Sequence, residues 1–147
     1  VAGRLNLGEI FNWDEDYDQY ESILFEKFYL GGSNTLRAYK PLKFKQDTIS
    51  TGVGSDDTLI LPFGNTAKLL TNWEIRFPLS EKFGLVVFYD GGLISQDLNI
   101  ITLDNIFWNR GIGLTYNSPF GPLRIDYGVS INDKNLNQLH FGLGYSF

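Results

Sequence analysis

The chain has 147 residues, enough for one ordinary domain, with a formal net charge of −5, no cysteine and one histidine. The acidic balance argues against a nucleic-acid partner, because phosphates require a basic surface. The lack of cysteine excludes disulfides and thiol catalysis, and a single histidine leaves too few ligands for a zinc site. No run of about 18 apolar residues occurs, so no transmembrane helix is predicted.

Alternation of apolar and polar residues is the dominant pattern, and it predicts β-strands rather than helices. Each alternating segment has about the 9–11 residues that a tilted strand needs to cross a bilayer. The six predicted strands are residues 1–11, 66–78, 81–92, 109–119, 121–131 and 137–147.

The connections between these strands differ in length. Residues 78–81 and 118–122 form short turns, whereas the connections at about 12–65, 95–106 and 132–136 are longer or more variable. Short turns at one end and long loops at the other are typical of outer-membrane barrels. The pattern therefore predicts a long extracellular loop within the first of these connections.

The two faces of the predicted strands favour a membrane barrel over a soluble sandwich. One face is apolar, while the other mixes Gly, Ser, Thr and Asn with charges of both signs, as suits a water-filled or plugged lumen. Aromatic residues recur near the strand ends, as in the interfacial girdles of transmembrane strands: Trp73, Phe77, Tyr89, Trp108, Tyr116, Tyr127, Tyr145 and Phe147. A soluble antiparallel sandwich remains the alternative, since its strands also alternate around an apolar core.

Six strands are too few to close a membrane barrel, which needs about eight. Open strand edges in lipid would leave backbone groups without partners. The barrel interpretation therefore predicts that the chain is part of a larger barrel or that it forms an oligomer.

Four motifs in order along the chain resemble the C-terminal barrel region of the BamA-like outer-membrane assembly factors, the POTRA-barrel or bacterial surface antigen superfamily. FEKFYLGGSNTLRAY at 25–39 resembles the long extracellular loop six of that family, and FYDGG at 88–92 is similar to its Phe-x-Asp-x-Gly strand motif. SPFGPLRIDYG at 118–128 resembles its penultimate hairpin. HFGLGYSF at 140–147 fits the C-terminal β-signal of outer-membrane proteins.

The resemblance implies an all-β fold, an antiparallel transmembrane β-barrel in which residues 1–147 form about the last six of sixteen strands. Ten earlier strands and periplasmic POTRA domains would precede them. The implied function is non-enzymatic assembly and insertion of outer-membrane β-barrel proteins. The alternative is a protein-translocation pore of the two-partner-secretion or autotransporter-assembly type, and a plain structural barrel or porin is a third interpretation.

The implied location is the outer membrane of a Gram-negative bacterium, with an organelle outer membrane as the alternative. The implied partners are outer-membrane lipids and lipopolysaccharide, unfolded outer-membrane client proteins, and, in the full-length protein, POTRA domains and accessory lipoproteins. No cofactor is implied. Insertion and translocation share these motifs, so the number of POTRA domains would distinguish them.

The resemblance also implies a set of functional residues. Those of the loop-six motif are Gly31, Gly32, Leu36, Arg37, Ala38 and Tyr39, and their partners on the lumen side are Glu74, Phe88, Asp90 and Gly92. In relatives the loop folds into the barrel and its arginine contacts the inner wall. Strand alternation independently places Glu74, Phe88 and Asp90 on the lumen side. The alternative is that Arg37 is a solvated loop residue.

A guanidinium suits this position because it can pair with a carboxylate and stack on an aromatic ring, which lysine cannot imitate. Two carboxylates around Arg37 would exceed its charge, so a second cation such as Arg76, or a water molecule, is expected beside them. One departure concerns Ala38, where the family usually has glycine. Glycine can adopt backbone conformations that strain alanine, which would weaken the motif.

The resemblance assigns the β-signal, and a seam with the first barrel strand, to His140, Gly142, Tyr145 and Phe147. Glycine on the inner face of that strand is compatible with a weak seam. Elsewhere, an acidic cluster superficially suggests calcium: Asp14, Glu15, Asp16 and Asp18. Its order lacks the glycine and final glutamate of an EF-hand, so no metal site is predicted. No set of nucleophile, base and acid can be assembled around His140, so no catalytic residue is predicted.

Overall fold

The computed structural model describes residues 1–11, 27–50, 58–62 and 64–147. None of the helices within these ranges is long and apolar enough to cross a membrane. The strands are β1 (Ala2–Glu9), β2 (Gln46–Ser50), β3 (Thr58–Pro62), β4 (Ala67–Pro78), β5 (Phe83–Ser95), β6 (Phe107–Ser118), β7 (Gly121–Ser130) and β8 (Asn137–Leu143). Two short 3₁₀-helices, η1 (Leu98–Ile100) and η2 (Leu103–Asn105), lie between β5 and β6.

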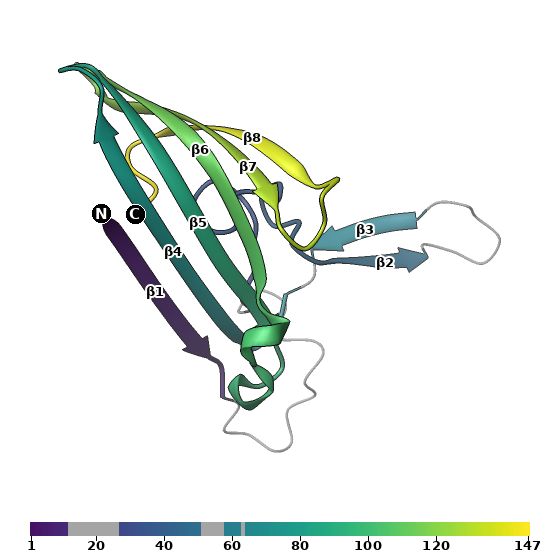
Figure 1. Ribbon diagram of the computed structural model, residues 1–147. Helices are drawn as coiled ribbons and strands as arrows, with labels where there is room; N and C mark the ends of the chain where they lie inside the picture. Colours follow the sequence, from purple (N-terminus) through teal and green to yellow (C-terminus); the bar gives the residue numbers. More distant parts are fainter. Residues whose placement is uncertain (12–26, 51–57, 63) are drawn as a thin grey trace.

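Six of the strands form one antiparallel sheet in the order β1-β4-β5-β6-β7-β8. The predictions of an all-β fold and of six long strands are confirmed. The sheet is curved, and residues 30–44 lie on its concave side (Figure 1). β1 and β8 form the two edges of this sheet.

The prediction missed the hairpin of β2 and β3, which forms a separate two-stranded sheet within the connection from β1 to β4. Its strands are five residues each and lie within the long connection predicted at about 12–65. Five residues give too short an alternation to separate a strand from a loop. The hairpin projects away from the six-stranded sheet (Figure 1).

The connections follow the predicted division between two ends of the sheet. Residues 79–82 and 119–120 join neighbouring strands as short turns at one end. The longer connections, between β1 and β4, between β5 and β6 and between β7 and β8, leave and re-enter the sheet at the other end, which is called the loop end below. The turns and the loop end are separated by the full length of the strands (Figure 1).

The two faces of the sheet have opposite character, and they do not match a soluble sandwich. Many large apolar side chains of the convex face are exposed: Leu5, Leu7, Trp73, Ile75, Phe77, Val87, Tyr89, Ile112, Leu114, Leu123, Ile125, Tyr127, Leu139, Phe141 and Leu143. A soluble protein rarely exposes so large an apolar surface. The polar side chains of the concave face are buried, among them Asn72, Asp90 and Asp126.

The hydrophobic core lies on the concave side, near the loop end. Leu30, Leu36, Tyr39 and Phe44 from the connection pack with Ile94 of the sheet. The rings of Tyr39 and Phe44 meet edge to face, with 5.1 Å between their centroids. The connection from β1 to β4 therefore holds its own apolar cluster against the inner face of the sheet.

The last predicted strand is shorter than expected. β8 ends at Leu143, and Gly144 has a φ of +84°, which takes the chain out of the extended conformation. Beyond it, the guanidinium carbon of Arg76 lies 4.8 Å from the ring centroid of Tyr145, and that of Arg4 lies 4.9 Å from the ring centroid of Phe147. The prediction that the strand continues to Phe147 is therefore wrong.

Candidate functional site

The segment that carries the loop-six motif is shaped by two glycines. Gly31 and Gly32 have φ values of +107° and +109°, which other residues rarely adopt. A Cβ on Gly31 would lie 2.5 Å from the carbonyl oxygen of Lys40. The amide of Gly32 donates to the carbonyl of Tyr39 (3.0 Å), and that of Gly31 donates to Oγ1 of Thr35 (2.9 Å). These contacts fold residues 31–40 into a compact turn.

Apolar anchors fix this turn against the sheet. Leu36 and Ala38 are fully buried and Tyr39 nearly so. A Cβ on Gly92 of β5 would lie 3.2 Å from Leu36, so the glycine leaves room for the leucine side chain. The anchors bring the intervening Arg37 to the middle of the concave face.

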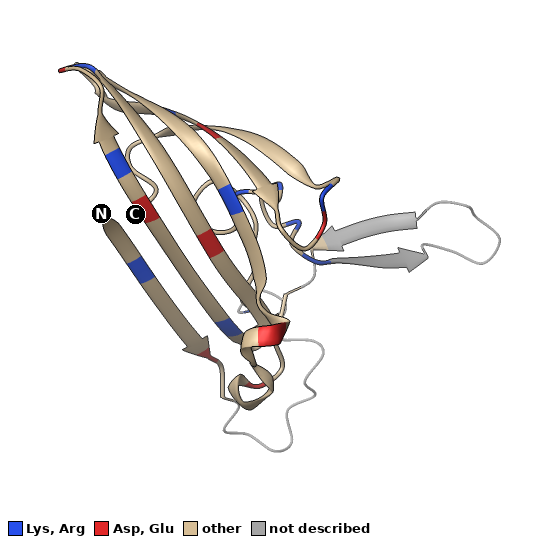
Figure 2. Cartoon of the chain, viewed as in Figure 1, with Lys and Arg blue, Asp and Glu red and all other residues tan. Residues whose placement is uncertain are grey.

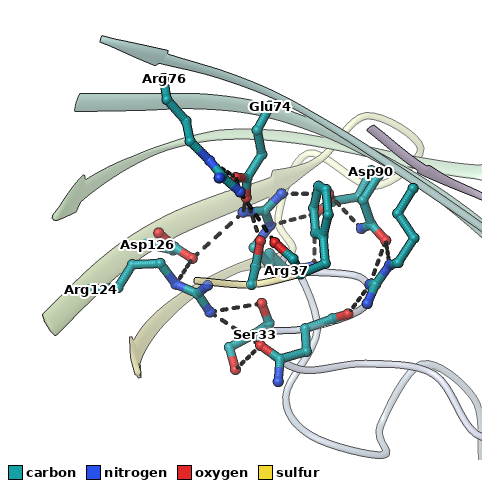
Figure 3. A network of polar contacts seen from close by, with 12 residues as sticks. Ser33, Arg37, Glu74, Arg76, Asp90, Arg124 and Asp126 are labelled. Atoms are coloured by element: carbon teal, nitrogen blue, oxygen red, sulfur yellow. Dashed lines mark hydrogen bonds and ion pairs between the residues drawn. The ribbon is translucent and has the colours of Figure 1, made fainter. Parts of the chain in front are cut away.

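Arg37 is 1% exposed and reaches two carboxylates on neighbouring strands (Figure 3). Its Nε donates to Oδ2 of Asp90 (2.9 Å) and its Nη2 to Oδ1 of the same residue (2.7 Å). Its Nη1 donates to Oε1 of Glu74 (2.7 Å). The pairing with Asp90 is bidentate, the arrangement that gives guanidinium–carboxylate pairs both strength and a fixed orientation. The structure thus brings together the three charged residues that the sequence grouped.

The ring of Phe88 lies against the same guanidinium, with 3.5 Å between the guanidinium carbon and the ring centroid. A Cβ on Gly111 of β6 would lie 2.3 Å from this ring, so that glycine gives the ring its space. Stacking uses the flat face of the guanidinium while its edge pairs with carboxylates. Arg37 therefore makes every contact expected of it, and its functional role remains a prediction.

Glu74 connects Arg37 to the end of the described chain. Nε of Arg76 donates to Oε2 of Glu74 (2.8 Å), so Arg76 is the second cation that the sequence led us to expect. The hydroxyl of Ser146 donates to Oε1 of the same carboxylate. Phe147 lies beside Arg76, whose Nη2 donates to its carbonyl oxygen (3.4 Å). The residues after β8 thus belong to the same polar cluster as the motif arginine.

A further ion pair, which the sequence analysis missed, comes from β7. Nε of Arg124 lies 2.7 Å from Oδ2 of Asp126, and Nη1 of Arg37 lies 3.6 Å from the same oxygen. Nη2 of Arg124 also donates to the carbonyl of Ser33 (3.1 Å). In the sequence, Arg124 and Asp126 both occupy polar positions of the alternating strand. This alternation could have identified them as residues of the inner face.

Asn72 of β4 ties the turn to the first strand. Its Nδ2 donates to Oδ1 of Asp90 (2.8 Å) and to the carbonyl of Thr35 (2.7 Å). Its Oδ1 accepts from Nε of Arg4 on β1 (3.1 Å), and Arg4 also donates to the carbonyl of Asn34. Arg4 and Asn72 were not among the predicted site residues.

The backbone of the motif touches the last two strands as well. Nε2 of His140 on β8 lies 3.1 Å from the carbonyl oxygen of Arg37. A Cβ on Gly128 of β7 would lie only 2.3 Å from that oxygen, so a side chain there would displace the turn. The structure places Gly142 beside the guanidinium of Arg124, with 3.3 Å from a built Cβ to Nη2. Of the predicted seam residues, His140 thus contacts the loop-six motif directly.

The alanine after the motif arginine is accommodated without strain. Among the non-glycine residues that the structure describes, only Leu42 has a positive φ. Ala38 therefore keeps an ordinary backbone conformation, and the expected weakening of the motif at this position does not arise from φ. Its side chain is fully buried.

The assembled cluster has charges of both signs, with one more guanidinium than carboxylates. It contains the guanidinium groups of Arg4, Arg37, Arg76 and Arg124 and the carboxylates of Glu74, Asp90 and Asp126. Burial alone would lower the pKa of Arg37, but hydrogen bonds and charge from Asp90 and Glu74 outweigh burial and raise that pKa above its ordinary value. Arg37 thus stays charged, and a paired buried charge is an anchor that is costly to break.

The cluster is suited to holding a loop rather than to catalysis, since its charged groups are paired with each other. Within the described part of the chain, no group of three or more His, Cys, Asp or Glu residues could hold a metal ion. The acidic cluster considered for calcium, residues 14–18, lies outside the described residues.

An antiparallel sheet with an exposed apolar outer face, a polar inner face and a loop anchored inside it defines part of a membrane β-barrel. The model of the Omp85 superfamily domain matches residues 5–147, so the chain belongs to the Omp85 superfamily. The chain is also similar to "Outer envelope protein 80, chloroplastic" of Arabidopsis thaliana, with 27% identity over 127 residues, 81% of this chain and 15% of that protein. The chain therefore spans only a small part of that relative.

Family membership fixes the coarse character of the protein. Omp85 proteins are non-enzymatic assembly and transport barrels, as the sequence analysis expected for this chain. They reside in the outer membrane of a bacterium or of an organelle. The described sheet is a fragment of such a barrel domain.

Proposed function

We propose that this chain forms the last six of sixteen strands of an outer-membrane assembly factor that inserts other β-barrel proteins into the membrane. The observation that carries the proposal is the anchoring of Arg37 to Asp90 and Glu74 on the concave face. A plain porin gives no reason to hold a loop inside its wall by a buried charge cluster. Burying such charges is costly, so a defined loop position has a function.

The proposed partners follow from the two faces. The apolar convex face suits outer-membrane lipids and lipopolysaccharide, and the outer edge of β8 suits an incoming client strand, since an open edge is a template for pairing. POTRA domains and accessory lipoproteins would attach through the preceding part of the full-length protein. The connection that includes residues 27–50 would lie on the extracellular side.

A bacterial outer membrane is the proposed location, and the organelle outer membrane is the alternative, favoured by the name of the chloroplast relative. Fractionation of the source cells separates the two. Recovery of the full-length protein with lipopolysaccharide-containing membranes would support the bacterial location. Recovery with an organelle envelope would overturn it.

The second candidate function is a protein-translocation pore of the two-partner-secretion or autotransporter-assembly type. The observation that favours it is the position of residues 30–45, which lie on the concave side where they would narrow a lumen. A transporter would release this segment during passage of a substrate, whereas an insertase would keep it in place.

One experiment tests the insertion function. The full-length protein is reconstituted in vesicles, and a urea-unfolded outer-membrane barrel protein is added as client. Faster folding of the client, read as its heat-resistant band on a gel, would support insertion, and Arg37→Ala should reduce it. Arg37→Lys, which keeps the positive charge but not the paired donors of the guanidinium, is the matched control. Its rate of client folding should lie between those of the wild type and Arg37→Ala. No acceleration by the wild-type protein would overturn the insertion proposal.

A further inference from the structure

The convex face of β4 to β8 carries one charged side chain. Along these strands the residues in the outward phase are apolar or uncharged, except Arg110 on β6. Arg110 is exposed, and its guanidinium has no ion pair or hydrogen bond with another residue in the described ranges. Every other arginine of this sheet faces the concave cluster. An unpaired cation on an apolar face requires a partner from outside the chain or a route to water.

The position of Arg110 along its strand narrows these options. It lies three residues from Phe107, where β6 begins at the loop end. Figure 2 shows that most of the sheet ribbon carries uncharged residues. With a rise of about 3.3 Å per residue, that is about 10 Å along the strand. A tilt of about 40° reduces the depth to about 8 Å below the strand end. The side chain can therefore reach the headgroup level at the loop end, where a cation costs little.

An aromatic pair lies beside Arg110 on the convex face. In the sheet register Arg110 lies between Tyr89 of β5 and Val129 of β7. The ring of Tyr89 stacks on Trp108, with 5.0 Å between the centroids. Tyrosine and tryptophan gather at the level of lipid headgroups because their rings are apolar at one end and polar at the other.

An apolar groove begins next to this guanidinium and continues toward the middle of the sheet. It has a volume of about 340 Å³, and its lining residues are Val87, Phe88, Arg110, Gly111, Ile112, Tyr127 and Val129. On the convex side, the groove lies among the outward side chains of Val87, Ile112 and Tyr127. A groove with a cation at its headgroup end matches an amphiphile with an anionic head and a hydrocarbon tail.

We propose that Arg110 and this groove bind an anionic lipid of the leaflet at the loop end. The lipid phosphate pairs with the Arg110 guanidinium, and an acyl chain lies in the groove beside Ile112 and Tyr127. A guanidinium can engage a phosphate with two parallel hydrogen bonds, which favours arginine over lysine here. The inference rests on the membrane placement of the sheet under the proposed function, and it adds a lipid class and a binding residue.

Native mass spectrometry of the full-length protein in mild detergent tests the site. Phosphatidylglycerol and phosphatidylcholine are titrated in parallel, and the bound molecules of each are counted. We expect the wild-type protein to retain phosphatidylglycerol preferentially. Arg110→Gln should weaken the tightest phosphatidylglycerol binding about tenfold, the size of one charge-assisted contact. Arg110→Lys should lie between the two.

Lys134→Gln is the matched control, because Lys134 is an exposed cation in the turn at the same end of the sheet. It removes the same charge away from the groove and should leave the binding unchanged. Equal binding by wild type and Arg110→Gln, or an equal loss with Lys134→Gln, would overturn the inference. This measurement is independent of the client-folding experiment. Preferential lipid binding can be absent while insertion activity is present, and lipid binding can be present while insertion activity is absent.

Discussion

Arg37 and Arg110 show how differently the two faces of one sheet hold the same side chain. Arg37 on the concave side lies among three carboxylates and a phenyl ring, with 1% of its surface exposed. Arg110 on the convex side is exposed and has no partner in the described part of the chain. The inner face supplies its own counter-charges, because the loop it anchors comes from the same chain. On the outer face, a counter-charge for Arg110 has to come from outside the described chain.

The largest effect is expected from removing the inner arginine. Arg37→Ala leaves the buried carboxylate of Asp90 without its ion-pair partner among the described residues, and breaking a buried pair costs about 3–5 kcal/mol. We expect the turn at residues 31–40 to detach and become sensitive to protease in the full-length protein. Limited proteolysis and complementation of a deletion strain measure this. Unchanged protease resistance together with full complementation would contradict the anchoring role.

The next largest effect is expected from a new positive charge on the convex face, at a position farther from the loop end than Arg110. Leu114→Arg places a cation near the middle of β6, at the level of the bilayer core, where it costs about 2–4 kcal/mol. The urea midpoint of the full-length protein in vesicles should fall accordingly. Leu103→Arg, on an exposed residue of η2 at the loop end, is the control and should have little effect. Equal midpoints for both variants would contradict the membrane placement.

A smaller effect is expected where the turn approaches the wall without any charge. Gly128→Ala introduces a Cβ that would lie 2.3 Å from the carbonyl oxygen of Arg37. Overpacking of this kind costs about 1–3 kcal/mol, and it should loosen the turn without changing the cluster residues. Limited proteolysis detects it. Gly142→Ala is the control, since its nearest atom is the flexible end of Arg124 at 3.3 Å. A Gly128→Ala protein as resistant as wild type would mean that the backbone contact is not needed.

The smallest effect is expected from removing the hydrogen bond that joins the residues after β8 to the charged cluster. Ser146→Ala removes one of the hydrogen bonds to Glu74, whose other contacts with Arg37 and Arg76 remain. The expected loss is about 1 kcal/mol, because one neutral donor is removed. Thermal unfolding of the full-length protein measures it, and Ser146→Thr, which keeps the hydroxyl, should behave as wild type. A larger loss with Ser146→Thr than with Ser146→Ala would argue against the hydrogen bond.

Local sequence determined which side chains face inward. Alternation is a property of neighbouring residues, so it placed Glu74, Phe88 and Asp90 on one face without knowledge of any partner strand. The family resemblance then linked Arg37 to those residues. Arg76 followed from counting charges, since two carboxylates around one guanidinium require another cation.

Only the tertiary structure decided which inward residues meet. The contact of His140 with the carbonyl of Arg37 spans 103 positions, and that of Arg124 with Ser33 spans 91. Such pairs depend on strand register and on the path of the turn, which no local pattern encodes. The end of β8 at Leu143 likewise depends on the φ of Gly144, because glycine is compatible with both an extended strand and a turn. Period-two alternation is a local signal and could be read from the sequence, whereas contacts between distant segments required the folded sheet.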